Sequence, residues 1–297
     1  MLSTTPLHFD NSISTFSYSA GLNYTLNRHT AVYARFTDGR KAPNATFYLD
    51  QDTQEKIDNL DPIAQRVVQL EGGLKIRKGR FSLFATPFYS VLSNVNETVV
   101  GQEPDGTGYF LTDLYNTIKT GGLELETTVP IARNFSVRAV ATFQKATADV
   151  YKTYSLGQNG RGDDRVIDLS GNEMENNPRI MLSITPTYAT DKFDVGLNFY
   201  HMGARKANVA NAFELPAYSL LNLVLGWQAS ERVRVGLNIQ NLANTYGIMG
   251  WTAPGAFPAN LDRAGFTADR VAANPSAAFG TLGVQARAYF LTAAYKF

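Results

Sequence analysis

The 297-residue chain has no cysteine, only two tryptophans and almost no excess charge. Without cysteine, disulfides, thiolate metal sites and a cysteine nucleophile are excluded. Lysine and arginine number 27 against 26 acidic residues, which argues against a nucleic-acid-binding protein with its basic excess. The first residues lack the basic start and apolar stretch of a signal peptide, and no apolar run reaches the roughly 18 residues of a spanning helix. None of these missing features excludes a membrane protein that crosses the bilayer with strands.

Alternation of apolar and polar residues with period two is the dominant positive signal. In residues 15–26 the even positions are apolar and the odd positions carry threonine, serine, glycine or asparagine. A strand places two such sets on opposite faces. The alternation predicts eleven strands, at about 13–26, 30–37, 65–77, 81–100, 110–129, 134–147, 178–189, 192–203, 216–228, 232–246 and 282–297.

Short and long connections take turns between these strands, which predicts an antiparallel up-and-down meander with one smooth rim and one loop-rich rim. Only residues 51–60 have a helical pattern, of a turn or two. Several strands keep alternating for ten or more residues, whereas strands of soluble proteins average about 5–6 and strands tilted across a bilayer need about 9–11. The sequence therefore favours an all-β transmembrane barrel over a soluble barrel or sandwich.

Charged residues in the middle of the strands fall on the polar face and are predicted to line the lumen of such a barrel. They are Glu71, Lys75, Glu124, Glu126, Arg138, Asp194 and Arg234, together with Arg35. Their signs are mixed, so the lumen does not reveal the charge of a transported solute. Arg138 is expected to balance Glu124 and Glu126 from the neighbouring strand.

Signals for catalysis or metal binding are weak. His8, His29 and His201 lie far apart without metal-ligand spacing, and no Gly-x-Ser-x-Gly motif or convincing Ser–His pair is present. The acidic stretches 49–61 and 160–176 contain calcium-type ligands without an ordered register, which favours solvated loops. We expect no catalytic, cofactor or metal site. Aromatic residues of the long loops are either ligand contacts or loop packing: Phe47, Tyr48, Tyr109, Tyr151, Tyr154, Phe213, Trp251 and Phe257.

Five stretches resemble, in order, the C-terminal half of TonB-dependent outer-membrane receptors. They are VYARFTDGRKAPN (32–44), the hairpins 69–89 and 116–143, VRVGLNIQNLANTYG (233–247), and the ending AYFLTAAYKF (288–297). The resemblance implies uptake of a scarce solute such as a metal chelate, vitamin or glycan, energised through TonB and without enzyme activity. It also implies that Tyr289, Leu291, Tyr295 and Phe297 face lipid and signal to the barrel-assembly machinery.

An odd count of eleven strands predicts that the first strand begins on the extracellular side, and eleven is half of the 22 strands of plugged transporters. We therefore expect a C-terminal fragment, with residues 1–12 an extracellular loop remnant and residues 13–297 a partial barrel. The plug and the contact with the TonB complex would lie upstream. The expected partners are outer-membrane lipid, the assembly machinery, TonB and a transported small molecule, and no nucleic acid.

Three alternatives stay open at this point. The first is a passive porin or smaller outer-membrane barrel with an overlooked strand. The second is an outer-membrane hydrolase that uses His201. The third is a soluble all-β binding protein.

Overall fold

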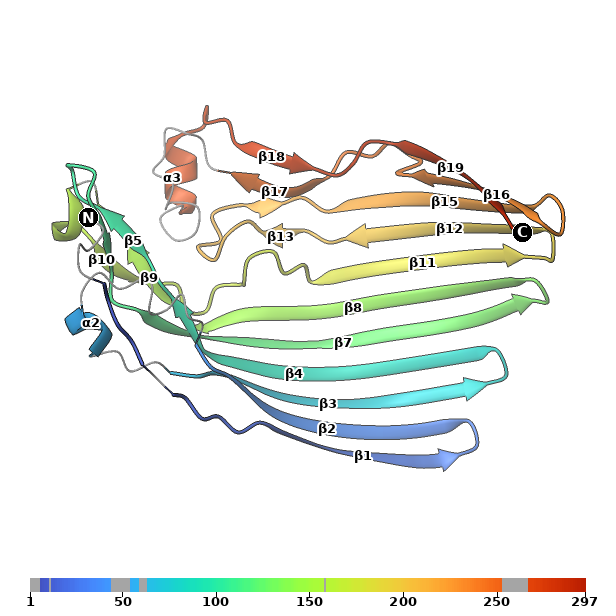
Figure 1. Cartoon of the computed structure of the whole chain (residues 1–297), viewed down its shortest axis with the longest axis horizontal. Helices are drawn as coiled ribbons and strands as arrows, with labels where there is room; N and C mark the ends of the chain where they lie inside the picture. Colours follow the sequence, from blue (N-terminus) through green and yellow to red (C-terminus); the bar gives the residue numbers. More distant parts are fainter. Residues whose placement is uncertain (1–5, 11, 44–53, 59–62, 158, 253–266) are drawn as a thin grey trace.

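The computed structural model describes residues 6–10, 12–43, 54–58, 63–157, 159–252 and 267–297. Its main feature is one antiparallel sheet whose eleven strands follow one another in chain order (Figure 1). This order confirms the predicted all-β meander of eleven strands. The strands are β1 (Tyr18–Asn27), β2 (Thr30–Lys41), β3 (Gln65–Lys78), β4 (Phe81–Glu97), β7 (Leu114–Ala132), β8 (Phe135–Val150), β11 (Ile180–Ala189), β12 (Phe193–Met202), β15 (Tyr218–Gln228), β16 (Val233–Gln240) and β19 (Ala288–Tyr295).

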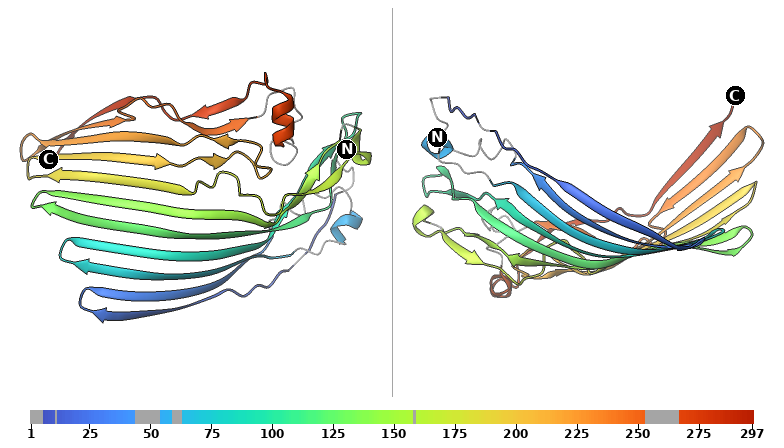
Figure 2. Two further views of the ribbon diagram at one scale, coloured as in Figure 1. Left: turned by 180° about the vertical axis from the view of Figure 1, so that it is seen from behind. Right: turned by 90° about the horizontal axis from the view of Figure 1, so that it is seen from below.

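The sheet is curved, and its two rims differ as the sequence predicts (Figure 2). Tight turns join β1 to β2, β3 to β4, β7 to β8, β11 to β12 and β15 to β16 at one rim, where the chain ends. The long connections and the N-terminal residues lie at the other rim. Within the described residues, β1 and β19 each pair with one strand only, so the sheet is an open part of a barrel.

The long loops contain regular structure that the alternation in the sequence does not predict. Four small hairpins form there, β5–β6, β9–β10, β13–β14 and β17–β18. Among the helices, α2 (Gln54–Asp58) confirms the turn predicted within 51–60, whereas η1 (Gly160–Gly162) and α3 (Ala268–Ala273) were not expected. No helix in the described part of the chain is long and apolar enough to cross a membrane. The hairpin strands are β5 (Val100–Gln102), β6 (Gly108–Phe110), β9 (Lys152–Ser155), β10 (Arg165–Asp168), β13 (Arg205–Lys206), β14 (Glu214–Leu215), β17 (Ile248–Thr252) and β18 (Gly280–Gly283).

The predicted bounds are wrong at both edges of the sheet and at the end of β16, which stops at Gln240 instead of residue 246. The first strand begins at Tyr18 instead of residue 13, because the pairing beyond it continues through a side chain: the Arg40 amide donates to Ser17 Oγ at 2.8 Å. The last strand begins at Ala288 instead of residue 282. The segment before it bonds to the turn after β16, where the Arg287 amide donates to Asn244 Oδ1 at 3.0 Å.

The register gives the sheet two chemically different faces, because directly opposed residues of an antiparallel pair point to the same side. We call the face that holds Glu126 and Arg138 the polar face and the other the apolar face. Large apolar side chains on the apolar face are exposed, with Leu22 at 73 % and Leu291 at 76 %. A soluble sandwich buries one face of its sheet, so this exposure contradicts the soluble alternative.

Charged groups on the apolar face gather at its loop-side end. Asp38 is almost fully buried there and accepts hydrogen bonds from Arg66 Nη2 at 2.6 Å and from Arg40 Nε at 3.3 Å. On β7, Lys119 Nζ donates to Asp149 at 2.6 Å. Such paired groups fit the polar boundary of a bilayer rather than its apolar centre, where a charge is costly.

Candidate functional site: the polar face and its loops

The ion pairs of the polar face join neighbouring strands and neutralise one another. Arg35 Nε lies 3.5 Å from Glu71 between β2 and β3, and Arg138 Nη2 donates to Glu126 at 2.8 Å between β7 and β8. Lys75 Nζ lies 4.1 Å from the centre of the Tyr33 ring. Because these pairs are exposed, each contributes only about 0–1 kcal/mol to stability. Their main effect is to leave the face with little net charge.

A third pair spans two strand spacings and passes over a glycine. Arg234 on β16 bonds to Asp194 on β12, and Gly226 of β15 lies between them, opposite Asp194 in the register. A Cβ at Gly226 would collide with both charged side chains. The small residue therefore lets the two charges meet across β15.

The structure places all seven predicted lumen residues, from Glu71 to Arg234, on the polar face when the register is followed strand by strand. The expected pairing is wrong in one detail: Arg138 binds Glu126 and not Glu124, which lies opposite Thr86 and forms no ion pair among the described residues. Their role as lumen lining stays a prediction, as does the assembly role of Tyr289, Leu291, Tyr295 and Phe297. The exposed side chains of the first three share the apolar face, and the Phe297 ring, beyond the end of β19, packs edge-on against Tyr295.

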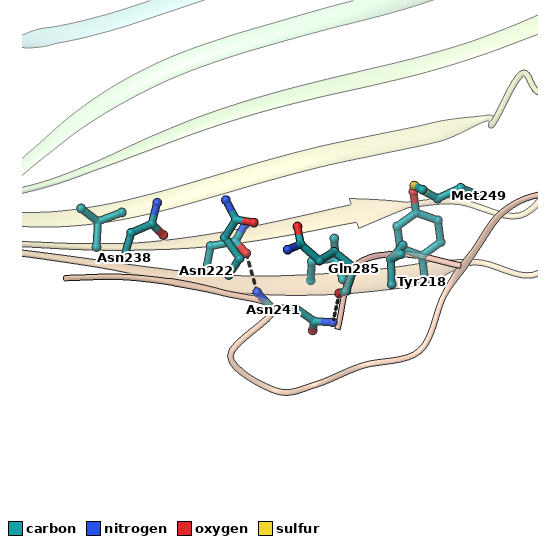
Figure 3. Close-up of a pocket in the computed structure, with 10 residues that line it drawn as sticks. Tyr218, Asn222, Asn238, Asn241, Met249 and Gln285 are labelled. Atoms are coloured by element: carbon teal, nitrogen blue, oxygen red, sulfur yellow. Dashed lines mark hydrogen bonds between the residues drawn. The ribbon is translucent and has the colours of Figure 1, made fainter. Parts of the chain in front are cut away.

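A pocket of about 350 Å³ lies on the polar face where β15 and β16 approach the loops (Figure 3). None of its ten lining residues is charged. Half of them carry carboxamides, and the other half offer a phenol ring, a thioether or aliphatic groups. The carboxamides belong to Asn222, Asn238, Gln240, Asn241 and Gln285, and the remaining walls to Tyr218, Leu220, Val224, Met249 and Val284.

Asn241 shapes one side of this pocket and explains the asparagine in the stretch QNLANTYG. It has a φ of 49°, a left-handed conformation that asparagine adopts more readily than most residues. Its amide donates to Asn222 Oδ1, and its Nδ2 donates to the carbonyls of Thr245 and Gln285, all at 2.9 Å. Through its backbone amide and its side chain, this one buried residue ties β15, the turn after β16 and the segment before β19 together.

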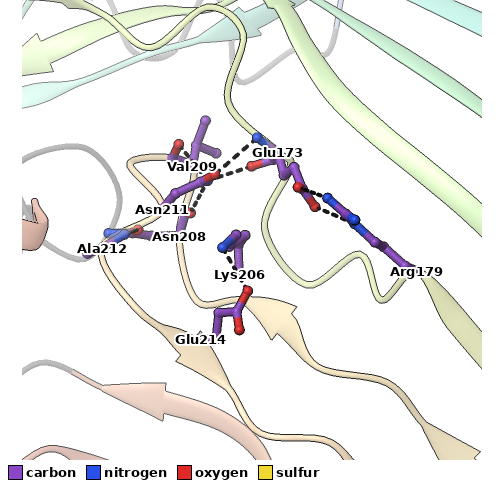
Figure 4. Close-up of polar contacts among 8 residues, drawn as sticks. All are labelled: Glu173, Arg179, Lys206, Asn208, Val209, Asn211, Ala212 and Glu214. Carbon is purple, nitrogen blue, oxygen red and sulfur yellow. Dashed lines mark hydrogen bonds and ion pairs between the residues drawn. The ribbon is translucent and has the colours of Figure 1, made fainter.

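Loop segments above the pocket form one body, which we call the loop platform (residues 172–179, 203–217, 246–252 and 279–284). Asn211 joins two of them, since its Nδ2 donates to the Glu173 carbonyl and its Oδ1 accepts from the Glu173 amide (Figure 4). Arg179 forms a two-pronged hydrogen bond with the Glu173 carboxylate. This bond holds the pKa of Glu173 below its ordinary value of 4.5.

Arg205 joins β13 to the β17–β18 hairpin within the loop platform. Its side chain is only 6 % exposed, and its Nη2 donates to the carbonyls of Ile248 and Met249, both at 2.8 Å. Its Nη1 is buried without a partner among the described residues. Next to it, Trp251 Nε1 donates to the Ala207 carbonyl at 2.9 Å, and the Trp251 ring packs edge-on against Phe213 at 4.8 Å. Of the predicted loop aromatics, these two pack the platform.

A second loop body contains Tyr109 and residues 160–171 of the acidic stretch 160–176. Tyr109 is 3 % exposed, donates its hydroxyl to Asp164 and lies 4.5 Å below the Arg161 guanidinium. Burial, and then the Asp164 hydrogen bond, raises the pKa of Tyr109 well above its ordinary value of 10. Asp168 accepts from the Ser170 amide, so these carboxylates have protein donors. Among the described residues no group of three or more His, Cys, Asp or Glu could hold a metal. Residues 49–53 and 59–61 of the other acidic stretch, and Phe47, Tyr48 and Phe257, lie outside the described residues.

Sequence reasoning missed a contact at His201. Its Nδ1 lies 2.9 Å from Ser219 Oγ on the apolar face, where the register places the two residues opposite each other. A hydrolytic triad needs a third group that orients the imidazole. Within the described residues the imidazole has no such hydrogen-bond partner, so the contact is a cross-strand hydrogen bond. Only the register, which requires the strand bounds, could have found it.

Comparison with known proteins settles what this sheet belongs to. The family model described as "TonB dependent receptor-like, beta-barrel" matches residues 3–242. The chain belongs to the TonB-dependent receptor family. The match agrees with the predicted partial barrel and outer-membrane location, and this is a family of receptors rather than enzymes. No curated protein sequence matches the chain.

Solved structures of TonB-dependent receptors share the fold at low sequence identity. The ferric yersiniabactin uptake receptor FyuA of Yersinia pestis has a TM-score of 0.63 and 17 % identity over 94 % of this chain and 37 % of its own. The ferric-catecholate import receptor Fiu of E. coli K12 has a TM-score of 0.62 and 21 % identity over 95 % of this chain and 35 % of its own. The copper transporter OprC has a TM-score of 0.66 and 13 % identity over 95 % of this chain and 40 % of its own. The chain thus spans roughly a third to two fifths of the length of these structures.

Proposed function

We propose that this chain is the C-terminal part of the barrel of a receptor that takes up a scarce, bulky solute across the outer membrane. Energy would come from the inner membrane through TonB, which would act on a plug contributed by the upstream part of the protein. The candidate solutes are a metal chelate, a vitamin or a glycan. The single observation that carries the proposal is the family match over residues 3–242.

The geometry supports a receptor rather than a porin. The loop platform is packed by buried groups such as Arg205 and Asn208. Ordered loops over a neutral pocket suit the capture of a specific solute, because little entropy is lost when a preformed site binds its ligand.

Two measurements on the purified full-length protein test the proposal. In planar bilayers we expect no steady single-channel conductance, because a plug would close the barrel. In a binding assay we expect the protein to bind the periplasmic domain of TonB. A steady porin-like conductance without TonB binding would instead support the passive porin.

The hydrolase alternative rests on the His201–Ser219 contact and has its own test. Replacement of Ser219 by alanine should leave the hydrolysis of a short-chain nitrophenyl ester at the background rate of the unmodified protein. Turnover above background that the replacement abolishes would revive this alternative.

A further inference from the structure

We propose that the carboxamide-lined pocket between β15, β16 and the segment around Gln285 binds an uncharged part of the transported solute that is rich in hydroxyl or amide groups. This inference rests on the proposed function and names the chemistry of its ligand. It concerns binding alone, which requires no energy from TonB.

The pocket has free hydrogen-bonding capacity. Asn238, Gln240 and Gln285 make no side-chain hydrogen bonds within the described part of the chain, and Figure 3 shows Asn238 on β16 and Gln285 on the segment before β19. A carboxamide offers two donors and an acceptor with two lone pairs. Hydroxyl and amide groups of a ligand have the same mixed character, so they can satisfy both kinds of site at once.

The lining of the pocket offers no counter-charge to an anion, since none of its residues is charged. The guanidinium of Arg205, which lies 5.9 Å from the ring of the lining residue Tyr218, is buried and donates to the carbonyls of Ile248 and Met249. Further along β16, Arg234 is paired with Asp194. An anionic chelate placed against this wall would lose water without gaining a counter-charge, which is unfavourable. The pocket therefore discriminates against negative charge.

The size of the pocket and its apolar end suit one part of a bulky solute. Its volume of about 350 Å³ lies at the lower end of the roughly 300–1,000 Å³ range of ligand pockets, so it holds part of a bulky solute. At its loop end Tyr218 and Met249 offer a ring and a thioether, which contact the carbon skeleton of a ligand. Asn241, held by three hydrogen bonds, keeps the pocket preformed.

Equilibrium binding to the purified full-length receptor in detergent tests this inference with three probes. Maltoheptaose is neutral and rich in hydroxyls, a ferric trihydroxamate cyclic peptide is neutral and rich in amides, and a ferric tris-catecholate is trianionic. We expect one neutral probe to bind, and the anionic probe to bind at least about tenfold more weakly, which is one step of 1.4 kcal/mol. Whichever neutral probe binds identifies the source as a glycan or a chelate.

Two sets of variants assign the binding to the pocket. The double replacement Asn238→Leu with Gln240→Leu should weaken the neutral probe about tenfold, since it removes two hydrogen-bonding groups at near-constant volume. The isosteric replacement Asn238→Asp should also weaken binding of the neutral probe. This variant still tests the pocket if the double variant fails to fold. The control Gln69→Leu removes a carboxamide from the polar face of β3 and should change binding less than about twofold.

Three results would overturn the inference: no binding of either neutral probe, tighter binding of the anionic probe, or neutral binding that neither pocket variant weakens. The proposed function is judged separately. If the protein binds TonB but fails these tests, the proposed function stands and the ligand binds elsewhere. If it binds a neutral probe but not TonB, the pocket inference stands and the proposal of energised transport is wrong.

Discussion

Replacing Arg205 by alanine should release the β17–β18 hairpin from the loop platform. The two hydrogen bonds from its guanidinium to the carbonyls of Ile248 and Met249 contribute about 1.5–3 kcal/mol each, as bonds from a charged donor. Against this, its buried and unpartnered Nη1 costs about 1–3 kcal/mol, which the replacement recovers. The cation–π contact with the Tyr218 ring at 5.9 Å adds at most about 1 kcal/mol. The net loss is on the order of 3 kcal/mol.

Hydrogen exchange on the full-length receptor measures this loss directly. A cost of about 3 kcal/mol raises the population of the undocked hairpin roughly 100-fold, so the paired amides of residues 248–252 should exchange faster by about that factor. The matched control is Lys206→Ala, next along the chain, which breaks an exposed ion pair with Glu214 worth less than about 1 kcal/mol. A rate change below about threefold for the Arg205 variant, or an equal change in the control, would refute the reasoning.

Three further predictions concern other parts of the molecule. Gly226→Ala should separate the ion pair above β15 and cost less than about 1 kcal/mol, because the added Cβ displaces only the partly exposed ends of the Arg234 and Asp194 side chains. The expected result is a small decrease in the temperature of heat modification on electrophoresis, and a large decrease would count against the geometry. Because the pKa of Glu173 lies below its ordinary 4.5, its hydrogen bonds to Arg179 should hold above that pH and be lost as the pH falls through the lowered value. Exchange of the nearby amides should therefore accelerate only below about pH 4.5. Asn241→Ala should destabilise the β15–β16 edge more than Asn241→Gly, which keeps the positive φ, and equal unfolding midpoints would contradict this.

The sheet could be predicted from the sequence because its signal is local. Alternation along 15–26 or 192–203 is visible within one strand, and the length of each run separates a bilayer strand from a soluble one. The family resemblance rested on the same runs with their turns. The predicted strand ends were wrong where a side chain replaces the backbone as hydrogen-bond partner, as at Ser17. The sequence of a single strand does not show which group its neighbour will bond to.

The loop platform and the pocket could not be predicted from the sequence, because the contacts that build them are not local. The bonds that build them join residues far apart in sequence, with a separation of 43 positions from Arg205 to Ile248 and of 44 from Asn241 to Gln285. The segments themselves are short and have no period. Hairpin β13–β14 has two residues in each strand. Buried polar groups such as Asn208 decide these contacts, and their partners become visible only in the folded chain.

The most direct test of the account is to determine which face of the sheet meets lipid. The 297 residues contain no cysteine, so spin labels can be attached at single cysteines introduced from Val195 to Tyr200 along β12 in the full-length protein in outer-membrane vesicles. The account predicts that labels at odd positions, such as Leu197, collide mainly with oxygen dissolved in lipid. Labels at even positions, such as Asn198, should then be shielded from lipid. The opposite alternation, or none, would contradict the assignment of the polar face to the lumen.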